Sequence, residues 1–431
     1  MKRRNFIKNT SVLASITLIP SNVWSNIKKG KIRIAQVGVG GMIGEFDIDS
    51  MSSHPSVEVA ALCDVDSQYL ASAQAKFPKA KGFEDYRNLF DNMGNEIDAV
   101  LVSTPDHTHA PVSMLAMENG KHVYCQKPLA HHVSEARAMR TMAEETGLVT
   151  QMGTQVHSFK EYRSAVLLVQ AGIIGKVHTV RAWSPKNWGY DGGIPDGPNP
   201  IPDHLNWDLW LGTAPKRDYI KDYYHPINWR KVLDYGCGTL GDMGVHIFDT
   251  PYSALNLDVP KTIKTKCRQP NGFSHPEHNV VTYEFPGTEF TTKRLKWVWY
   301  DGEGAPLKIH RELKLPDGEK LPEQGSMFIG EKGRLLLPHF DYPKLIVQNQ
   351  YQPIDYPELE EHDHYHQFVD ACMDKGKTSA PFSYASRLTE AILLGVVANR
   401  FPKKQLHWNN LDQRFDEEEA NRYLNVKYRN F

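Results

Sequence analysis

The first part of the chain alternates apolar runs with segments of helical period. Runs rich in β-branched residues, bounded by glycine, proline or polar residues, predict buried strands at Lys31–Val39, Val57–Leu62, Ile97–Val102, Lys121–Cys125 and Leu148–Met152. Helical patterns lie between them, at Pro111–Asn119 and Ser134–Thr146. Strands that alternate with helices predict a parallel sheet whose ligands lie at the carboxyl ends of the strands.

The pattern changes after residue 153. Further strands are predicted at Lys261–Lys266, Asn279–Phe285, Thr288–Trp299, Met327–Gly330 and Arg334–Leu337, with helices near His366–Met373 and Tyr384–Arg400. A chain of 431 residues exceeds what one core holds. We therefore predict an α/β protein of two domains, a Rossmann-type domain at 30–153 and an α/β domain with an open sheet at 154–431.

Composition narrows the possible partners. The formal net charge is -1, with 40% hydrophobic and 23% charged residues, and no basic block tracks a phosphate backbone. Nucleic acid is therefore not an expected partner. The five cysteines are scattered, without the spacing of a disulfide framework or a zinc site.

The first 29 residues have the pattern of an export signal. Lys2–Lys8 is basic and carries the pair Arg3-Arg4, and Ser11–Pro20 is short and mildly apolar. This order is typical of a twin-arginine signal. We predict a periplasmic protein without a membrane span after export; the alternative is a frayed, basic amphipathic start.

The turn after the first strand has the composition of a phosphate-binding loop. Gly38 and Gly40 lie where a pyrophosphate needs the backbone close, at the start of a helix. The third glycine of the fingerprint is displaced, because Ile43 occupies its place and Gly44 follows. The predicted cofactor contacts of this turn are Gly38, Gly40, Gly41, Met42 and Ile43; a plain glycine-rich turn is the alternative.

An acidic residue follows the second strand. Asp64 is placed to bind the adenosine ribose hydroxyls and to repel a 2′-phosphate, and no arginine occurs in Val65-Asp66-Ser67. NAD is therefore favoured over NADP, unless Asp64 is only a turn residue or helix cap. Further cofactor contacts are predicted at the later strand ends, at Thr104, Pro105, His107, Gln126 and Lys127.

Five segments, in this order, resemble the Gfo/Idh/MocA oxidoreductases in their exported bacterial branch. They are GVGGMIG, CDVD, STPDHTHA, YCQKPL and GDMGVHIFD, and the resemblance spans about Lys31 to Arg400. It implies a Rossmann domain and a larger domain with a mostly antiparallel sheet, through which homo-oligomers form. It also implies a sugar, cyclitol or related carbohydrate as substrate.

The resemblance also implies roles for single residues. Lys127 matches the lysine of the family's E-K-P motif, and Asp242 and His246 match its D-x-x-x-H pair. Lys127 would hold the reacting hydroxyl, His246 would accept its proton, and Asp242 would orient substrate or base. A spacing of four on a predicted helix places Asp242 and His246 on one face. Lys127, Asp242 and His246 are thus the predicted catalytic and substrate-binding residues.

Two further positions bear on the cofactor. Gln126 replaces the glutamate of the motif, which removes an anion beside Lys127 but keeps a group able to hydrogen-bond the nicotinamide. By resemblance Gln155 lies near the nicotinamide; its alternative is a linker turn between the domains.

The segment between Ser184 and Asn228 is irregular and rich in aromatic residues. Trp183, Trp188, Trp207, Trp210 and Trp229 lie in or beside it, with Tyr190, Tyr223 and Tyr224. Aromatic faces stack on sugar rings, so we interpret it as a substrate-covering loop; the alternative is a satellite core of packed rings. Trp229 and Arg230 are predicted substrate contacts, and a surface salt bridge is the alternative for Arg230.

Three functions remain open. The first is oxidation of a ring hydroxyl to a ketone with hydride transfer to tightly bound NAD. The second is a redox-neutral cleavage of a glycosidic bond through a transient ketone, and the third is a non-catalytic sugar- or cofactor-binding protein. No metal is expected, because His362, His364 and His366 lack helical ligand spacing or a clear carboxylate partner.

Overall fold

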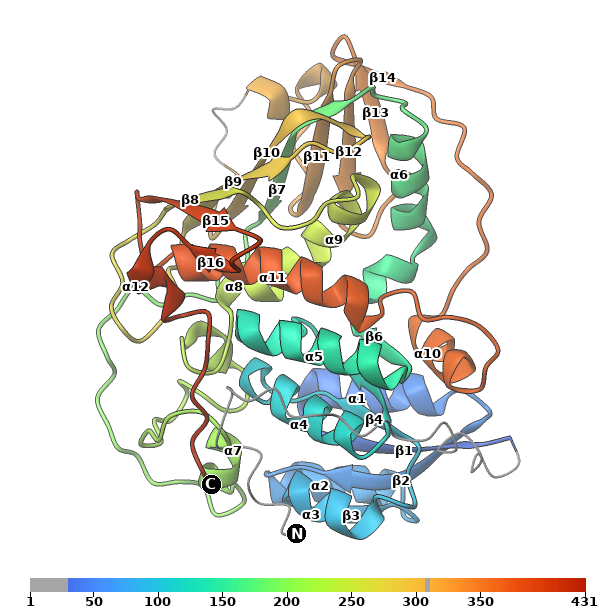
Figure 1. The fold of residues 1–431 in the computed structure, drawn as a ribbon, viewed down its shortest axis with the longest axis vertical. Helices are drawn as coiled ribbons and strands as arrows, with labels where there is room; N and C mark the ends of the chain where they lie inside the picture. Colours follow the sequence, from blue (N-terminus) through green and yellow to red (C-terminus); the bar gives the residue numbers. More distant parts are fainter. Residues whose placement is uncertain (1–29, 307–310) are drawn as a thin grey trace.

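The computed structural model describes residues 30–306 and 311–431, which form two sheets with helices packed between and around them (Figure 1). The first sheet is parallel and has the strand order β3-β2-β1-β4-β5-β6. Its strands are β1 (Ile32–Val37), β2 (Val57–Cys63), β3 (Lys81–Phe83), β4 (Ala99–Val102), β5 (His122–Cys125) and β6 (Thr150–Met152). The predicted Rossmann-type sheet is confirmed. Only β3, three residues long and mostly exposed, has no counterpart in the predicted strands.

Helices cover both faces of this sheet, which explains why its strands are apolar without alternation. They are α1 (Gly41–Ser52), α2 (Ser67–Lys76), α3 (Tyr86–Met93), α4 (Asp106–Glu118) and α5 (Val133–Thr146). A helix from far along the chain, α10 (His364–Cys372), packs on the same face as α1. There Tyr365 and Phe368 join Ile34, Leu101 and Tyr124 in one buried cluster.

The second sheet has ten strands in the order β14-β13-β12-β11-β7-β10-β9-β8-β15-β16. They are β7 (Val177–Ser184), β8 (Thr262–Lys266), β9 (Asn279–Pro286), β10 (Thr291–Asp301), β11 (Gly325–Gly330), β12 (Arg334–Pro338), β13 (Lys344–Val347), β14 (Gln350–Gln352), β15 (Gln405–Asn409) and β16 (Arg414–Phe415). Only β7 and β10 pair in parallel, so the predicted open, mostly antiparallel sheet is confirmed.

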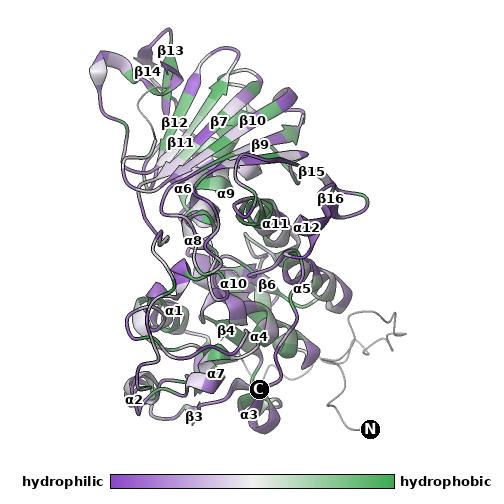
Figure 2. Cartoon of the chain, turned by 90° about the vertical axis from the view of Figure 1, so that its left-hand side faces the viewer, coloured by the Kyte–Doolittle hydropathy of each residue, from purple (hydrophilic) through white to green (hydrophobic). Residues whose placement is uncertain are grey.

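One face of the large sheet packs on helices that lie between the two sheets (Figures 1 and 2). These are α6 (Lys160–Gln170), α8 (Gly238–Asp242), α9 (Gly244–Ala254) and α11 (Phe382–Ala398). Helix α11 contacts both α5 of the first domain and β8 of the large sheet, so it joins the two cores. The remaining short helices are η3 (Gln155–Ser158), α7 (Trp207–Leu211), η4 (Asn228–Lys231), η5 (Arg311–Leu313), η6 (Pro316–Gly318) and α12 (Glu418–Asn421).

The opposite face of the large sheet is partly covered by the chain itself. Leu313 and Leu315 pack there on Trp183, Tyr300 and Met327 in a separate buried cluster. The homo-oligomer expected through this sheet stays a prediction. Within the described residues, no helix has the length and hydropathy of a bilayer span. The predicted export signal lies outside the described residues.

Candidate active site

Side chains would clash at three glycines in and just after the turn that follows β1. At Gly40, a Cβ would overlap the ring of Tyr69. Gly38 has φ +83°, and a Cβ there would lie 2.7 Å from the carbonyl oxygen of Ser103. A Cβ on Gly44 would lie 2.7 Å from the backbone of Val39. Gln36 fixes the turn, because its Nε2 donates to the carbonyl oxygens of Gly38 (2.9 Å) and Gly44 (2.7 Å). Gly44 therefore serves the close helix–turn packing for which the fingerprint places a glycine one residue earlier.

Helix α1 begins in a way that suits an anion. Its N-cap is Gly40, no side chain caps it, and its first turn has no acidic residue. The end of a helix leaves backbone N–H groups without intrahelical partners, and these attract phosphate. A Cβ on Gly41 would meet open space, Met42 is exposed and Ile43 is half-buried. The turn therefore fits the pyrophosphate of a dinucleotide.

Asp64 ties the end of β2 to the same turn. Its Oδ2 accepts from the backbone N–H groups of Val39 (2.9 Å) and Gly40 (3.0 Å), and its Oδ1 accepts from that of Asp66 (2.9 Å). Burial raises the pKa of Asp64 to about 6, in spite of these three donors. The carboxylate thus orders the phosphate-binding turn, and its contact with a ribose stays a prediction.

The end of β4 offers a polar atom that also fits a cofactor. Thr104 Oγ1 is buried and has no hydrogen-bond partner among the described residues. It stands beside Pro105, the N-cap of α4. Such an orphaned donor needs a partner to offset its desolvation. A ligand at the carboxyl ends of β1 and β4 would supply one.

Lys127 follows β5 and meets Asp242 at the end of α8. The Lys127 Nζ donates to Asp242 Oδ1 at 2.7 Å and to the Asp242 carbonyl oxygen at 3.2 Å. Arg230 Nε lies 3.4 Å from the same Oδ1. Burial alone would raise the pKa of Asp242, but the charges of Lys127 and Arg230 outweigh it and hold the pKa below its usual range. Two cations and one ionised carboxylate therefore meet at this point.

His246 lies one short helix further on. A single helix carrying Asp242 and His246 was the prediction, and it is wrong in detail: α8 ends at Asp242, α9 begins at Gly244, and Met243 lies between them. Nδ1 of His246 is buried without a hydrogen-bond partner among the described residues. Burial and the charge of Lys127 lower its pKa well below the ordinary value. The imidazole is therefore neutral, with a ring nitrogen in need of a partner.

Asp106, which was not predicted as a site residue, opens α4 beside this group. Its Oδ2 accepts from the backbone N–H of Cys237 at 3.0 Å. Burial raises its pKa to about 7, against the lowering charges of Arg230 and Lys127. Its place in the sequence, directly after Thr104-Pro105 at a strand end, was the available signal.

Most of the predicted aromatic loop is a packed cluster, so the alternative interpretation is confirmed for those rings. Trp207 and Trp210 stack at 4.7 Å in a buried group with Tyr224, Trp229 and Tyr235. Trp183 lies elsewhere, on the outer face of the large sheet.

The ring of His107 belongs to this aromatic cluster. Its Nε2 bonds the carbonyl oxygen of Trp210 at 3.1 Å, and its ring centroid lies 5.2 Å from that of Tyr235. Its Nδ1 is buried without a hydrogen-bond partner among the described residues, and the predicted cofactor contact of His107 stays a prediction.

Arg230 is held against indole rings rather than in a surface salt bridge. Its guanidinium carbon lies 4.2 Å from the ring centroid of Trp229 and 5.5 Å from that of Trp188. Trp229 is buried, so it acts as a support for Arg230. Stacking and the contact with Asp242 fix the direction of the guanidinium.

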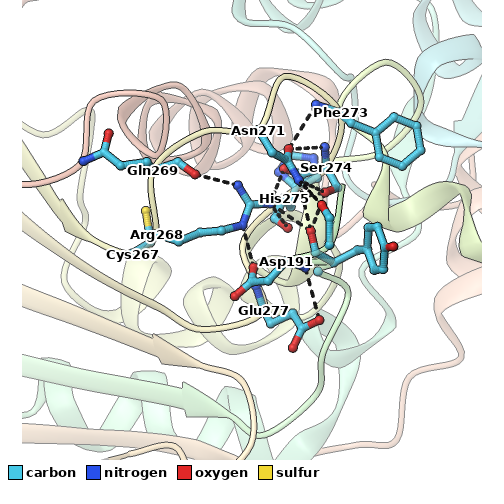
Figure 3. A network of polar contacts seen from close by, with 12 residues as sticks. Asp191, Cys267, Arg268, Gln269, Asn271, Phe273, Ser274, His275 and Glu277 are labelled. Atoms are coloured by element: carbon cyan, nitrogen blue, oxygen red, sulfur yellow. Dashed lines mark hydrogen bonds and ion pairs between the residues drawn. The ribbon is translucent and has the colours of Figure 1, made fainter. Parts of the chain in front are cut away.

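A polar network fastens Asp191 to the segment from Arg268 to Glu277 (Figure 3). Arg268 donates to the Asp191 carboxylate at 2.6 Å and to the carbonyl oxygens of Tyr190, Ser274 and His275. His275 Nε2 in turn bonds the carbonyl oxygen of Gly236 at 2.7 Å, just before α8. The network therefore connects Asp191 to the segment that carries Asp242.

Gln126 and Gln155 are linked through Asp47, which the sequence did not single out, and Tyr365. Gln126 Nε2 donates to both oxygens of Asp47, at 2.9 and 3.0 Å. Gln155 Nε2 donates to the Tyr365 hydroxyl at 2.8 Å, and that hydroxyl donates to Asp47 Oδ1 at 2.6 Å. The nicotinamide contacts of both glutamines stay predictions.

The histidines at 362–366 have separate hydrogen-bond partners. His364 is buried, with Nδ1 beside the Ser158 hydroxyl (2.7 Å) and Nε2 beside the Met152 carbonyl oxygen (2.9 Å). Across the described residues, no three His, Cys, Asp or Glu side chains gather as metal ligands would.

Two family models match consecutive parts of the chain. Residues 32–154 match the GFO_IDH_MocA model, described as the oxidoreductase family with an NAD-binding Rossmann fold. Residues 152–286 match the model of the C-terminal alpha/beta domain of that oxidoreductase family. The chain belongs to the Gfo/Idh/MocA oxidoreductase family. It is therefore an oxidoreductase with an NAD-binding Rossmann domain.

Sequence relatives of this Gfo/Idh/MocA protein are distant. It is 21% identical to the uncharacterized oxidoreductase YdgJ of Escherichia coli (strain K12), over 85% of this chain and 95% of that protein. It is 22% identical to a levoglucosan dehydrogenase of Pseudarthrobacter phenanthrenivorans, over 53% of this chain and 62% of that one. A glycosyl hydrolase family 109 protein of Stenotrophomonas maltophilia is 27% identical over 46% of this chain and 48% of its own.

Solved structures share the fold. The WlbA dehydrogenase of Bordetella pertussis, in complex with NADH and UDP-GlcNAcA, aligns with a TM-score of 0.62 at 14% identity, over 88% of this chain and 99% of that one. The aldose-aldose oxidoreductase of Caulobacter crescentus aligns with a TM-score of 0.61 at 16% identity, over 88% and 99%. At these identities the likeness concerns the arrangement of the two domains alone.

Proposed function

We propose that this protein oxidises a ring hydroxyl of a sugar, glycoside or cyclitol to a ketone. The observation that carries the proposal is the Lys127–Asp242 pair, 2.7 Å apart at the carboxyl end of the parallel sheet, with the neutral His246 beside it. When bound, the dinucleotide would take up the hydride from the carbon that bears this hydroxyl.

Lys127 and Asp242 would position the hydroxyl and compensate its developing charge. The Lys127 ammonium has three N–H donors and gives two of them to Asp242, so the third can hold the reacting oxygen. Asp242 keeps the ammonium in place and, since it is ionised, balances the pair. A preorganised cation of this kind stabilises negative charge on oxygen without reorganisation.

His246 would take the proton of the hydroxyl. A neutral imidazole has one nitrogen free to accept a proton, and the proposal is supported by Nδ1 of His246, which has no hydrogen-bond partner among the described residues. The lowered pKa keeps this nitrogen unprotonated at neutral pH. Arg230, stacked on Trp229, would hold a second polar group of the substrate and fix which hydroxyl faces Lys127.

NAD rather than NADP is the proposed cofactor. The carboxyl group of Asp64 lies at the end of β2, and no arginine follows within 65–67 to accommodate a 2′-phosphate. We further propose that the protein is exported in its folded state through the twin-arginine pattern at residues 1–29, with its cofactor bound. The cofactor would then stay bound through each catalytic cycle and would not exchange with a pool of free NAD(H).

Redox-neutral glycoside cleavage is the second candidate. It is favoured by the similarity to glycosyl hydrolase family 109 proteins. The same residues would serve: oxidation next to a ring carbon acidifies its proton, elimination releases the aglycone, and the hydride returns. The pair Lys127-Pro128 favours the dehydrogenase. The resemblance implies that the glycoside-cleaving branch of the family lacks this Lys-Pro pair.

One experiment separates these functions. Purified protein is first denatured to measure released NAD(H), and native protein is then incubated with a panel of free sugars, cyclitols and glycosides. NADH absorbance and product masses are recorded. Loss of two hydrogens from a substrate supports the dehydrogenase, and release of free aglycone supports the cleaving enzyme. No change in any compound would contradict both and leave a binding protein.

A further inference from the structure

A buried carboxylate that no predicted role explains lies behind Lys127. Asp47 belongs to α1 and is fully buried. Its Oδ1 accepts from the Tyr365 hydroxyl at 2.6 Å, and its Oδ2 accepts from the Ser103 hydroxyl at 2.6 Å. Gln126 Nε2 donates to both oxygens, at 2.9 and 3.0 Å. Burying a carboxylate is unfavourable unless it is hydrogen-bonded, and here three side chains from separate elements supply the donors.

The position of this group is set by the sheet. Ser103 follows β4 and Gln126 follows β5, so both lie at the carboxyl ends of adjacent parallel strands. Lys127, the proposed contact to the reacting hydroxyl, is the next residue after Gln126. The Lys127 charge acts on Asp47 and lowers its pKa in part. Asp47 therefore lies behind Lys127, at the carboxyl ends of β4 and β5.

The surrounding structure allows little freedom to this arrangement. The Gln126 side-chain amide packs against Gly153, which follows β6, so closely that a Cβ on Gly153 would lie 2.8 Å from it. Tyr365 is held by a stacked Tyr124 ring at 5.1 Å and by the Gln155 amide. Gln126 is neutral and donates its amide nitrogen to Asp47, so Asp47 on α1 carries the negative charge of this pair.

We propose that Asp47 is a positioning residue whose buried negative charge favours the oxidised nicotinamide over the reduced one. The oxidised ring carries a positive charge that the reduced ring lacks, so a fixed carboxylate nearby stabilises the oxidised form. Gln126 and Tyr365 hold the carboxylate, and Tyr365 makes this effect depend on the docking of α10. The inference rests on the proposed function, since it requires the nicotinamide to lie at the ends of β4 and β5.

The test measures affinity for NAD⁺ and for NADH by fluorescence, with the apo-protein and without substrate. Asp47→Asn should lower the preference for NAD⁺ over NADH by about fivefold to tenfold, the effect of removing one nearby charge. Asp47→Asn combined with Gln126→Glu restores the charge on the other partner of the pair and should return the ratio to within about twofold of wild type. Asp49→Asn, on the exposed side of α1, is the matched control and should leave the ratio unchanged.

The pH dependence of the wild-type protein gives a second readout that needs no variant. Burial raises the pKa of Asp47 to about 6, so its charge is present at pH 7 and lost by pH 5. The titratable groups that face it are the phenols of Tyr365 and Tyr124, the Cys125 thiol and the Lys127 ammonium. Burial raises the pKa of both phenols and of the thiol, so they do not ionise in this range. The preference for NAD⁺ should therefore fall more between pH 7 and pH 5 in wild type than in Asp47→Asn, where Asp106 beside Lys127, with its pKa raised to about 7, still loses its charge.

The outcomes separate this inference from the proposed function. An unchanged affinity ratio in Asp47→Asn, with both cofactor forms bound, overturns the role of Asp47. So does a wild-type ratio that is flat between pH 7 and pH 5. If neither cofactor form binds to wild type, the cofactor site and the role of Asp47 fall together. If the ratio shifts as expected but no sugar is oxidised, only the proposed substrate class fails.

Discussion

Lys127 and Asp242, 115 positions apart in the sequence, meet with the ammonium 2.7 Å from the carboxylate. The pair joins the end of β5 in the first domain to the end of α8 in the second. Only 11% and 13% of the two side chains are exposed, so solvent screens the pair little. Removing one partner therefore leaves the other charge buried and uncompensated.

The first prediction concerns this pair. Asp242→Asn should reduce kcat by about 100-fold or more, because the Lys127 ammonium loses the group that aims it at the substrate. Cofactor affinity should change little, because Asp242 belongs to α8 and is not part of the glycine turn or of the Asp64 site. Steady-state rates on the identified substrate and NADH titrations give the two numbers. Asp85→Asn, which removes a partly buried partner of Arg87 elsewhere in the first domain, is the control. A variant with wild-type kcat would contradict the proposed role of Asp242.

The second prediction concerns the planar guanidinium group of Arg230. Its guanidinium stacks on Trp229, and an ammonium cannot reproduce a planar stack. Arg230→Lys keeps the charge and should raise KM by about tenfold while kcat falls less than threefold. Arg217→Lys changes an arginine that faces Phe273 in the same aromatic cluster and pairs with Asp234. It should leave KM unchanged. Equal effects of the two substitutions would show that only the cluster's packing is being measured.

The two sheets, and the position of Lys127 at a strand end, follow from local patterns. Continuous apolar runs that end at glycine or proline identify buried parallel strands, and the residues after such strands face the ligand by topology. Lys127 was placed correctly for that reason. The helix carrying Asp242 and His246 was predicted as continuous, because the spacing of four does not reveal the break at Met243.

Asp47 and the aromatic cluster could not be identified from the sequence. Asp47 is one acidic residue in an amphipathic helix, and its importance appears only when Gln126 and Tyr365 converge on it. Trp207 and Trp210 are the residue types that a sugar site and a packed core both use. Which of these uses applies is decided by tertiary packing, and no local period encodes it.

The third prediction tests the displaced glycine. Gly44 lies within α1, where alanine would be favoured over glycine by about 1 kcal/mol on helix propensity alone. The backbone of Val39 stands 2.7 Å from the position of the added Cβ, so the helix must shift away from the turn. Gly44→Ala should therefore weaken NADH binding at least about tenfold, in spite of the better helix propensity.

Its control is a glycine far from the cofactor. Gly147 ends α5 with φ +64°, and a Cβ there would meet open space. Gly147→Ala should lower stability by about 1 kcal/mol through backbone strain and leave NADH affinity unchanged. A Gly44→Ala protein that binds NADH like wild type would show that Gly44 is not needed for the phosphate-binding turn.

The fourth prediction concerns stability against acid. Burial lowers the pKa of both His275 and His364 to about 4, whereas an unfolded histidine titrates near 6.5. Between these values the unfolded chain takes up protons that the folded protein does not. Their contribution to stability is therefore full above pH 6.5 and is lost as the pH falls toward 4. Each buried histidine of this kind destabilises the fold by about 2 kcal/mol at pH 5.

Buried carboxylates oppose this trend but are fewer. The raised pKa of Asp47 and Asp64, about 6 in both, makes the folded protein take up protons first, so each adds about 1.4 kcal/mol of stability as the pH falls from 7 to 5. Among the described residues, the histidines with a lowered pKa are His107, His109, His122, His131, His225, His246, His275, His339 and His364. The carboxyl groups with a raised pKa are Asp47, Asp64, Asp106, Glu118 and Asp301.

The histidines should therefore decide the sign, and the melting temperature should fall between pH 7 and pH 5. Differential scanning calorimetry at both pH values measures this. His364→Asn should be less stable than wild type at pH 7 but should lose about 2 kcal/mol less on acidification, because one proton-uptake site is gone. His178→Asn, at an exposed position, should keep the wild-type pH dependence. A melting temperature that stays level or rises toward pH 5 would mean that the buried carboxylates outweigh the histidines.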